Sequence, residues 1–128
     1  MKSNHHIGRQ GEFLAAFILE RHGIECHHVD RDGADLWCKA PGSGALFTVQ
    51  VKTCSAPRLS NVRAKTPHYT YHTQTCLDFE VMCFVAMDKQ LLLLVPRSEI
   101  VKTTTRFNVS EFTEEAQRRT IEEVLRTC

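Results

Sequence analysis

Apolar side chains recur along the chain with two different periods, which predict helices at both ends and strands between them. A helical period runs over residues 8–22 and another over residues 110–126. Shorter apolar segments typical of strands lie at residues 24–29, 34–40, 45–53, 79–87 and 90–95. This order of elements predicts a single α/β domain over residues 1–128, in which helices flank a mixed central β-sheet.

Residues 34–53 are expected to form a hairpin, because Pro-Gly-Ser-Gly at residues 41–44 is a tight-turn sequence. A turn at this place brings Asp35 roughly opposite Gln50. Side chains at alternate positions of a strand share a face, so Gln50 and Lys52 project together while the valines beside them face the other way. The hairpin therefore predicts that an acid, an amide and an ammonium group meet on one polar patch.

Glu12 is the fourth polar residue of interest and lies on the first expected helix. It stands one turn from Gly8 and from Ala16, so its side of the helix carries small side chains. Small side chains let another element approach closely, and a carboxylate there favours a nearby cation. Taken alone, Glu12 is explained as a surface acid, Asp35 as a turn residue and Lys52 as an edge-strand lysine. Their joint placement with an amide is what points to chemistry.

These residues suit metal-assisted hydrolysis of a phosphodiester, which needs compensation of transition-state charge and an activated water. Mg²⁺ prefers oxygen ligands and is commonly held by one or two carboxylates together with waters. Asp35 would be the central ligand, and Glu12 would bind directly or through water. The Gln50 side-chain oxygen or the Val51 carbonyl oxygen would complete the protein's share. Lys52 would orient or deprotonate the attacking water, or steady the phosphate.

A long stretch of the chain carries basic but no acidic residues. After Asp35 the next acid is Asp78, and residues 54–76 show no period, which predicts a long loop. Such a stretch suits a surface that faces phosphates, although a solvated loop explains its charge equally well. Tyr69 and Tyr71 could stack on bases or pack in the core. The candidate DNA-contacting residues are Arg58, Arg63, Lys65, His68, Tyr69, Tyr71 and His72.

Parts of this pattern resemble the PD-(D/E)xK nuclease superfamily in its Gln-x-Lys variant. The residues that carry the resemblance are Glu12, Gly33-Ala34-Asp35 and Val49-Gln50-Val51-Lys52. The order of elements is most similar to that of the small homing endonucleases of this superfamily, with archaeal Holliday-junction resolvases next. The resemblance implies a restriction-endonuclease-like core and a metal-dependent endonuclease that hydrolyses DNA with Mg²⁺, for which Mn²⁺ can substitute. It also implies that the active-site residues are Glu12, Asp35, Gln50 and Lys52.

Two positions depart from the superfamily pattern. Ala34 stands where the name-giving motif has proline, and Gln50 stands where it usually has an acid. The second change removes a negative charge from the expected metal site, so it would weaken metal binding, favour one ion over two, or leave a DNA-binding module without catalysis. A protein that shares the fold but has no nucleic-acid role is the third class, and it would make the basic stretch dispensable.

The oligomeric state enters through the expected chemistry. A single site cuts one strand, so cleavage of both strands of a duplex would favour a symmetric homo-oligomer, a dimer or a tetramer.

No apolar segment is long enough to cross a bilayer, and the first residues lack a signal-peptide pattern. We therefore expect a cytoplasmic protein with no membrane partner, and the resemblance implies DNA as its partner and a bacterial, archaeal or phage origin.

Six cysteines and seven histidines raise the question of zinc. The cysteines include no Cys-x-x-Cys pair, and no histidine stands at finger-like spacing from them. His68 and His72 are four residues apart, but the neighbouring Pro67 and the β-rich sequence between them argue against a shared helical face. We expect reduced, mostly structural cysteines, and neither a zinc site nor a cysteine nucleophile.

Overall fold

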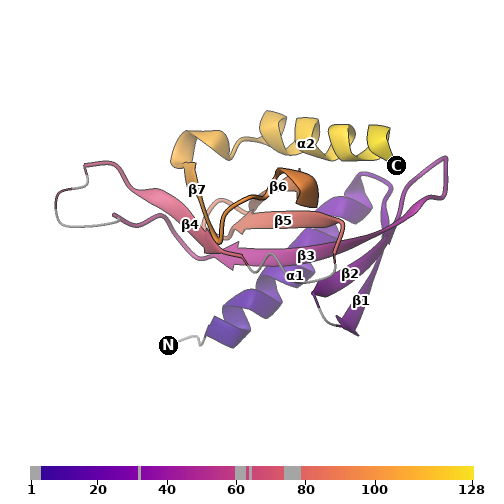
Figure 1. Ribbon diagram of the computed structural model, residues 1–128, viewed down its shortest axis with the longest axis horizontal. Helices are drawn as coiled ribbons and strands as arrows, with labels where there is room; N and C mark the ends of the chain where they lie inside the picture. The colour runs from indigo at the N-terminus through magenta and orange to yellow at the C-terminus, as the bar shows by residue number, and fades with distance from the viewer. Residues whose placement is uncertain (1–3, 32, 60–62, 64, 74–78) are drawn as a thin grey trace.

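The structure is a computed structural model that describes residues 4–31, 33–59, 63, 65–73 and 79–128 (Figure 1). Its helices are α1 (Asn4–Arg21) and α2 (Glu114–Thr127), with short 3-10 turns η1 (Arg97–Glu99) and η2 (Val109–Glu111). Its strands are β1 (Glu25–Arg31), β2 (Ala34–Lys39), β3 (Leu46–Cys54), β4 (His68–His72), β5 (Val81–Ala86), β6 (Leu91–Pro96) and β7 (Thr104–Asn108).

Five of the strands form one mixed sheet in the order β1-β2-β3-β5-β6. Neighbours in this sheet run antiparallel except β3 and β5, which are parallel. Helix α1 packs on β3 and β1, and α2 packs along β6 (Figure 1). The prediction of a mixed central sheet flanked by helices is therefore confirmed.

The remaining strands, β4 and β7, pair antiparallel with each other as a separate ribbon. The prediction that residues 54–76 form a loop is wrong at β4, and the sequence analysis assigned no strand to the residues of β7. The expected helix at residues 110–126 begins later than predicted, because its N-cap is Thr113. The Thr113 hydroxyl oxygen accepts a hydrogen bond from the Ala116 N–H at 3.0 Å.

Two clusters of buried residues form the core, one on each face of the large sheet. The first joins α1 and α2 to the apolar faces of β2, β3 and β5, with Leu19, Leu36 and Val49 fully buried. The second lies between the ribbon and the opposite face of the sheet, around Tyr69 and Phe84. Apolar residues on one face of β4 and β7 therefore fix the ribbon to the sheet, and the other face of the ribbon is left for polar side chains.

Both tyrosines of the chain lie in this second cluster, with Tyr69 0% and Tyr71 2% exposed. The Tyr69 hydroxyl donates to Asp88 Oδ1 at 2.8 Å, and the Tyr71 hydroxyl donates to the Val85 carbonyl oxygen at 2.8 Å. Burial raises the pKa of both phenols, and the hydrogen bond to the Asp88 carboxylate raises that of Tyr69 further. The structure therefore contradicts the assignment of these two rings to DNA contacts, since both are core residues.

We expect neither phenol to ionise at the ordinary tyrosine pKa of about 10 while the chain is folded. Because the folded pKa is raised, only the unfolded chain gains by ionising above that pH. The stability that depends on the neutral phenols is thus present below the ordinary pKa and is lost as the pH rises above it. In an alkaline titration, tyrosinate absorbance should appear only together with loss of far-ultraviolet circular dichroism. Tyrosinate formed near the ordinary pKa with the dichroism intact would contradict the burial.

The described cysteines, Cys26, Cys38, Cys54, Cys83 and Cys128, are free thiols. Cys26 and Cys38 lie directly opposite each other on β1 and β2, with their sulfur atoms 3.6 Å apart. Cys76 lies outside the described residues, as does Asp78, which the sequence analysis took as the end of the acid-free stretch. No helix in the described part of the chain is both long enough and apolar enough to span a membrane.

Candidate active site

The hairpin of β2 and β3 places Asp35 against the backbone of β3. Leu36 lies opposite Val49, and the same register continued by one residue sets Asp35 opposite Gln50. This confirms the register expected from the turn sequence. The Asp35 Oδ2 atom accepts a hydrogen bond from the Val51 N–H at 2.8 Å, so the carboxylate takes the place that a β2 backbone carbonyl would otherwise fill.

The same contact shows where the Val51 carbonyl points. The N–H and C=O of one strand residue point toward the same neighbouring strand. Because the Val51 N–H meets Asp35 on the β2 side, its carbonyl oxygen also faces that side, near the start of β2 at Ala34. A backbone oxygen and the Asp35 carboxylate are thus available at one edge of β3.

Gln50 is 7% exposed, an unusual burial for an amide side chain. Among the residues that the structure describes, its Oε1 atom has no hydrogen-bond partner. A buried polar atom without a partner costs roughly 1–3 kcal/mol, so such an atom calls for an explanation. It lies next to Val51 and opposite Asp35, where an oxygen ligand for a cation is expected.

Lys52 follows on the same face of β3 as Gln50. In the parallel pairing with β5, Gln50 lies opposite Met82 and Lys52 opposite Phe84. The Lys52 side chain is half-buried. Asp35, Gln50 and Lys52 therefore share one face of the hairpin, as the alternation of side chains predicts.

Glu12 comes from α1, which covers the other face of β3. The preceding residue, Gly11, is buried against Thr53, and a methyl group added at Gly11 would lie 2.8 Å from Thr53 Cβ and closer still to its hydroxyl oxygen. Only a glycine permits this approach of the helix to the strand. The close approach was expected on the side of Gly8 and Ala16. Ala16 packs against the core, but nothing lies within 4 Å of a methyl group at Gly8.

At the end of β3, the face that carries Gln50 and Lys52 and the face covered by α1 must be considered together. Strand β2 begins only at Ala34, and its pairing with β3 runs from Leu36–Val49 to Lys39–Leu46. Beyond Val51, β3 therefore lacks a β2 neighbour, and α1 crosses it at Thr53. Glu12, which is half-buried, follows Gly11 on α1, so it lies near the end of β3 but on a helix that covers the face opposite to Gln50 and Lys52.

These residues can be tested as ligands for Mg²⁺. Within the described residues there is no group of three or more His, Cys, Asp or Glu side chains that could hold a metal. A cation at this site would need the Gln50 amide oxygen and the Val51 carbonyl oxygen besides the carboxylates. All of these are oxygen donors, and Mg²⁺ usually keeps several waters, so the donor set fits the ion. The unpartnered Gln50 Oε1 is the observation that favours this fit.

The other candidate DNA-contacting residues lie on the surface. Arg58, Arg63, Lys65 and His72 are exposed, and His68 is half-buried. Arg58 pairs with His68 through two backbone hydrogen bonds of 2.9 Å, which form an isolated β-bridge at the edge of the ribbon. The basic stretch is therefore partly ordered as sheet, with its polar side chains outward.

One aromatic residue on this face was not among the residues predicted from the sequence. Trp37 is two residues from Asp35 on β2, so it shares the face of Asp35, and it is 46% exposed. Alternation from Asp35 was the signal that could have found it. An exposed indole beside a candidate metal site can stack on a base or a sugar, and it is the sole tryptophan of the chain.

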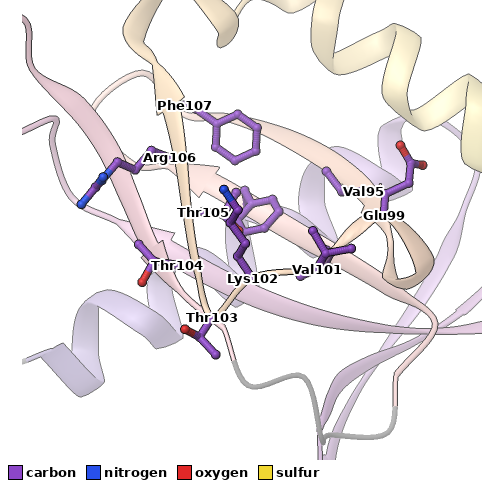
Figure 2. A pocket seen from close by; sticks show the side chains of 11 residues that line it. Val95, Glu99, Val101, Lys102, Thr103, Thr104, Thr105, Arg106 and Phe107 are labelled. Carbon is purple, nitrogen blue, oxygen red and sulfur yellow. The ribbon is translucent and has the colours of Figure 1, made fainter.

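A separate hollow of about 1000 Å³ opens beneath β7 (Figure 2). It is lined by residues of β5, β6, β7 and the segment before β7, among them Phe84, Val95 and Phe107. None of Glu12, Asp35, Gln50 and Lys52 lines it, so this hollow does not belong to the candidate active site.

Comparison with known proteins defines the class of fold. No protein-family model matches the chain, and no curated protein matches its sequence. Among solved structures it is similar to the bacterial homing endonuclease I-Ssp6803I, with a TM-score of 0.75 and 17% sequence identity. The similarity covers 99% of this chain and 94% of that chain. The chain therefore has a homing-endonuclease-like fold.

Proposed function

We propose that this protein is a metal-dependent endonuclease that hydrolyses DNA phosphodiester bonds. The observation that carries the proposal is the buried, unpartnered Gln50 Oε1 beside the Asp35–Val51 hydrogen bond. It is supported by the fold, which is shared with a protein described as a homing endonuclease. The arrangement also agrees with the Gln-x-Lys variant of the PD-(D/E)xK pattern.

In this proposal, Asp35, Gln50 Oε1 and the Val51 carbonyl oxygen would hold Mg²⁺ or Mn²⁺, and Glu12 would bind it directly or through water. A divalent cation bound there would neutralise phosphate charge and supply an activated water. Lys52 orients or deprotonates that water, or steadies the phosphate. The backbone N–H of Val51 keeps the Asp35 carboxylate oriented, so the ligand need not be reorganised when substrate binds.

The proposal includes a partner copy for cleavage of a duplex. One site of this kind acts on one strand, and two strands of opposite direction present equivalent bonds to sites related by a two-fold axis. A dimer or a tetramer of the chain would supply the second site. A single-strand nick requires only one copy.

The experiment that tests the proposal is cleavage of supercoiled plasmid and of a branched DNA in Mg²⁺, Mn²⁺ or EDTA. We expect metal-dependent cleavage by wild type and a loss of at least about 100-fold for Asp35→Asn, because the central ligand loses its charge. Asparagine keeps the size of the side chain and an oxygen that accepts from the Val51 N–H. Matching thermal unfolding of the two proteins would show that the difference is chemical.

A second readout does not depend on finding a substrate. Because Trp37 shares the face of Asp35, its fluorescence should change on titration with Mn²⁺ or Mg²⁺ and should not change in Asp35→Asn. If wild type neither responds to metal nor cleaves either DNA, the enzymatic proposal fails.

The alternative is a DNA-binding module that keeps the fold without catalysis. It is favoured by the same glutamine, which stands where the resembled pattern usually has an acid, and the described residues contain no group of three His, Cys, Asp or Glu side chains that could hold a metal. Gln50→Glu separates the two functions in the same assays. If Gln50→Glu cleaves where wild type does not, the natural chain is the weakened module, and if wild type itself cleaves, this alternative is wrong.

A further inference from the structure

The ribbon of β4 and β7 has two faces of opposite character. In the inward face, Tyr69 lies opposite Phe107, and Tyr71 lies against the Phe84 and Phe107 rings at centroid distances of 4.9 and 6.0 Å. The ribbon outer face consists of the alternate residues, His68, Thr70, His72, Thr104, Arg106 and Asn108. All six are exposed or half-exposed, so the ribbon presents a polar surface on a rigid apolar base.

The pairing brings two acid-free segments of the chain together. No Asp or Glu occurs among residues 36–77, and none occurs among residues 100–110. Directly opposite pairs across the ribbon are His68–Asn108, Thr70–Arg106 and His72–Thr104. Arg58 lies opposite His68 on the other edge of β4, so its side chain joins the same face. The ribbon outer face therefore carries two arginines and no acid.

A groove lies between this face, the end of β3 and the start of α1. It has a volume of about 460 Å³. Its lining includes Arg58, His68, Thr70 and His72 on the ribbon side and Thr53, the residue after Lys52, on the other side. The groove thus borders the ribbon and the face of β3 that carries Thr53, and Lys52 is not among the residues that line it.

We infer that the ribbon outer face enters the major groove of duplex DNA and that Arg106 is a specificity-determining residue there. The inference rests on the proposed function and names its substrate as a duplex. A two-stranded β-ribbon fits the major groove of B-DNA. Strands of five residues extend over about 17 Å, enough to follow several base pairs.

Arg106 has the position and the chemistry for reading a base. It lies in the middle row of the ribbon, opposite Thr70, and points away from the apolar base, on the other side of β7 from Phe107 (Figure 2). Its guanidinium group can donate two parallel hydrogen bonds to guanine O6 and N7. Arg58 and the histidines at the margins are placed to contact phosphates, which position the protein without reading sequence.

The test uses the full chain in EDTA, so that binding is measured without cleavage. Duplexes that bind wild type are selected from a randomised pool, and their affinities are measured by fluorescence anisotropy. Arg106→Ala should bind the selected duplex about tenfold to a hundredfold more weakly and should lose the preference at one base pair. Arg126→Ala is the matched control, since Arg126 is in the last turn of α2, at the opposite end of the molecule from the ribbon (Figure 1).

The groove is identified with the same duplex. Methylation of guanine N7, which lies in the major groove, should block binding of wild type, and a ligand that fills the minor groove should not compete. Equal binding by Arg106→Ala and Arg126→Ala, an unchanged base preference, or competition by the minor-groove ligand alone would overturn the inference. Arg106→Lys, which keeps the charge but not the paired donors, should retain phosphate-type binding and still lose the base preference.

The outcomes separate this inference from the proposed function. Binding through the ribbon without any cleavage would leave the inference intact and remove the proposed catalysis. Cleavage that depends on Asp35 but not on Arg106 would support the proposed catalysis and contradict the inference. If wild type binds no duplex, or binds single strands as tightly as duplexes, the inference fails whatever the cleavage assay gives.

Discussion

Replacing Lys52 by methionine should lower the rate of DNA cleavage by about 100-fold to 10,000-fold, the range lost when a group that moves or orients a proton is removed. Methionine keeps the length of the half-buried side chain, so the hairpin should stay folded. The Asp35 carboxylate and Gln50 remain, so the metal response of Trp37 fluorescence should be unchanged. The measurement is single-turnover cleavage of the DNA that wild type cuts, with binding to the same DNA measured in EDTA.

A matched variant controls for loss of charge. Lys39 is the exposed lysine of β2 on the same face as Asp35 and Trp37, at the turn end of the hairpin. Lys39→Met should cleave at nearly the wild-type rate, because it is remote from the Asp35–Val51 contact. If both methionine variants lose activity equally, the loss reflects general attraction to DNA, and the role given to Lys52 is wrong.

Lys52→Arg divides the remaining roles. An arginine keeps the positive charge near the phosphate but is not deprotonated in proteins. Recovery of most of the rate by Lys52→Arg would mean that the ammonium group steadies the phosphate. No recovery, with DNA binding restored, would mean that Lys52 orients or deprotonates the attacking water.

The hairpin of the candidate site could be predicted because its determinants are local. The Pro-Gly-Ser-Gly turn sets the register, and the alternation of side chains then places Asp35, Gln50 and Lys52 on one face. The burial of Gln50 Oε1 without a hydrogen-bond partner could not be predicted in this way. It depends on how deeply the strand lies under its neighbours, which is set by residues far away in the sequence.

The ribbon escaped prediction for a physical reason as well. Strand β4 pairs with β7, far along the chain, and each strand has only five residues with a short apolar pattern. Without its partner, the sequence around β4 is equally typical of a loop, since Pro57 and Pro67 flank a segment without period. The same missing partner explains why Tyr69 and Tyr71 could not be assigned to the core from sequence.

The helix–strand contact at Gly11 could be predicted from the sequence only in part. A run of small side chains on α1 indicates that some element approaches closely, but which glycine meets it depends on the angle at which the helix crosses the sheet. The crossing places Gly11 over Thr53 and leaves Gly8 in open space. Two glycines three residues apart on one helix therefore have opposite environments, which makes them a matched pair for experiment.

Gly8→Ala and Gly11→Ala should shift stability in opposite directions. In open space, alanine is favoured over glycine within a helix by up to about 1 kcal/mol, so Gly8→Ala should stabilise the fold. At Gly11 the added methyl group meets Thr53 at 2.8 Å from Cβ and 2.9 Å from Cγ2. Overpacking of this kind costs about 1–3 kcal/mol, more than the gain in propensity. Urea unfolding followed by circular dichroism measures both variants.

The expected difference in activity is larger than the difference in stability. A helix pushed off β3 at Gly11 carries Glu12 with it, and a displacement of about 1 Å at a reacting group can cost about 100-fold in rate. Gly11→Ala should therefore cleave much more slowly than wild type when both are assayed without urea, at a temperature where both are folded. Gly8→Ala, which leaves the helix in place, should cleave as wild type does.

Thr53→Ala tests whether the clash is the cause. Alone, it removes a buried hydroxyl group that has no hydrogen-bond partner among the described residues, so it should cost little. Combined with Gly11→Ala, it removes the hydroxyl oxygen and Cγ2 that the new methyl group meets, and it should restore part of both stability and cleavage. Strictly additive losses in the double variant would mean that Gly11 acts through helix flexibility and not through its contact with β3. The proposed positioning of Glu12 by that contact would then be wrong.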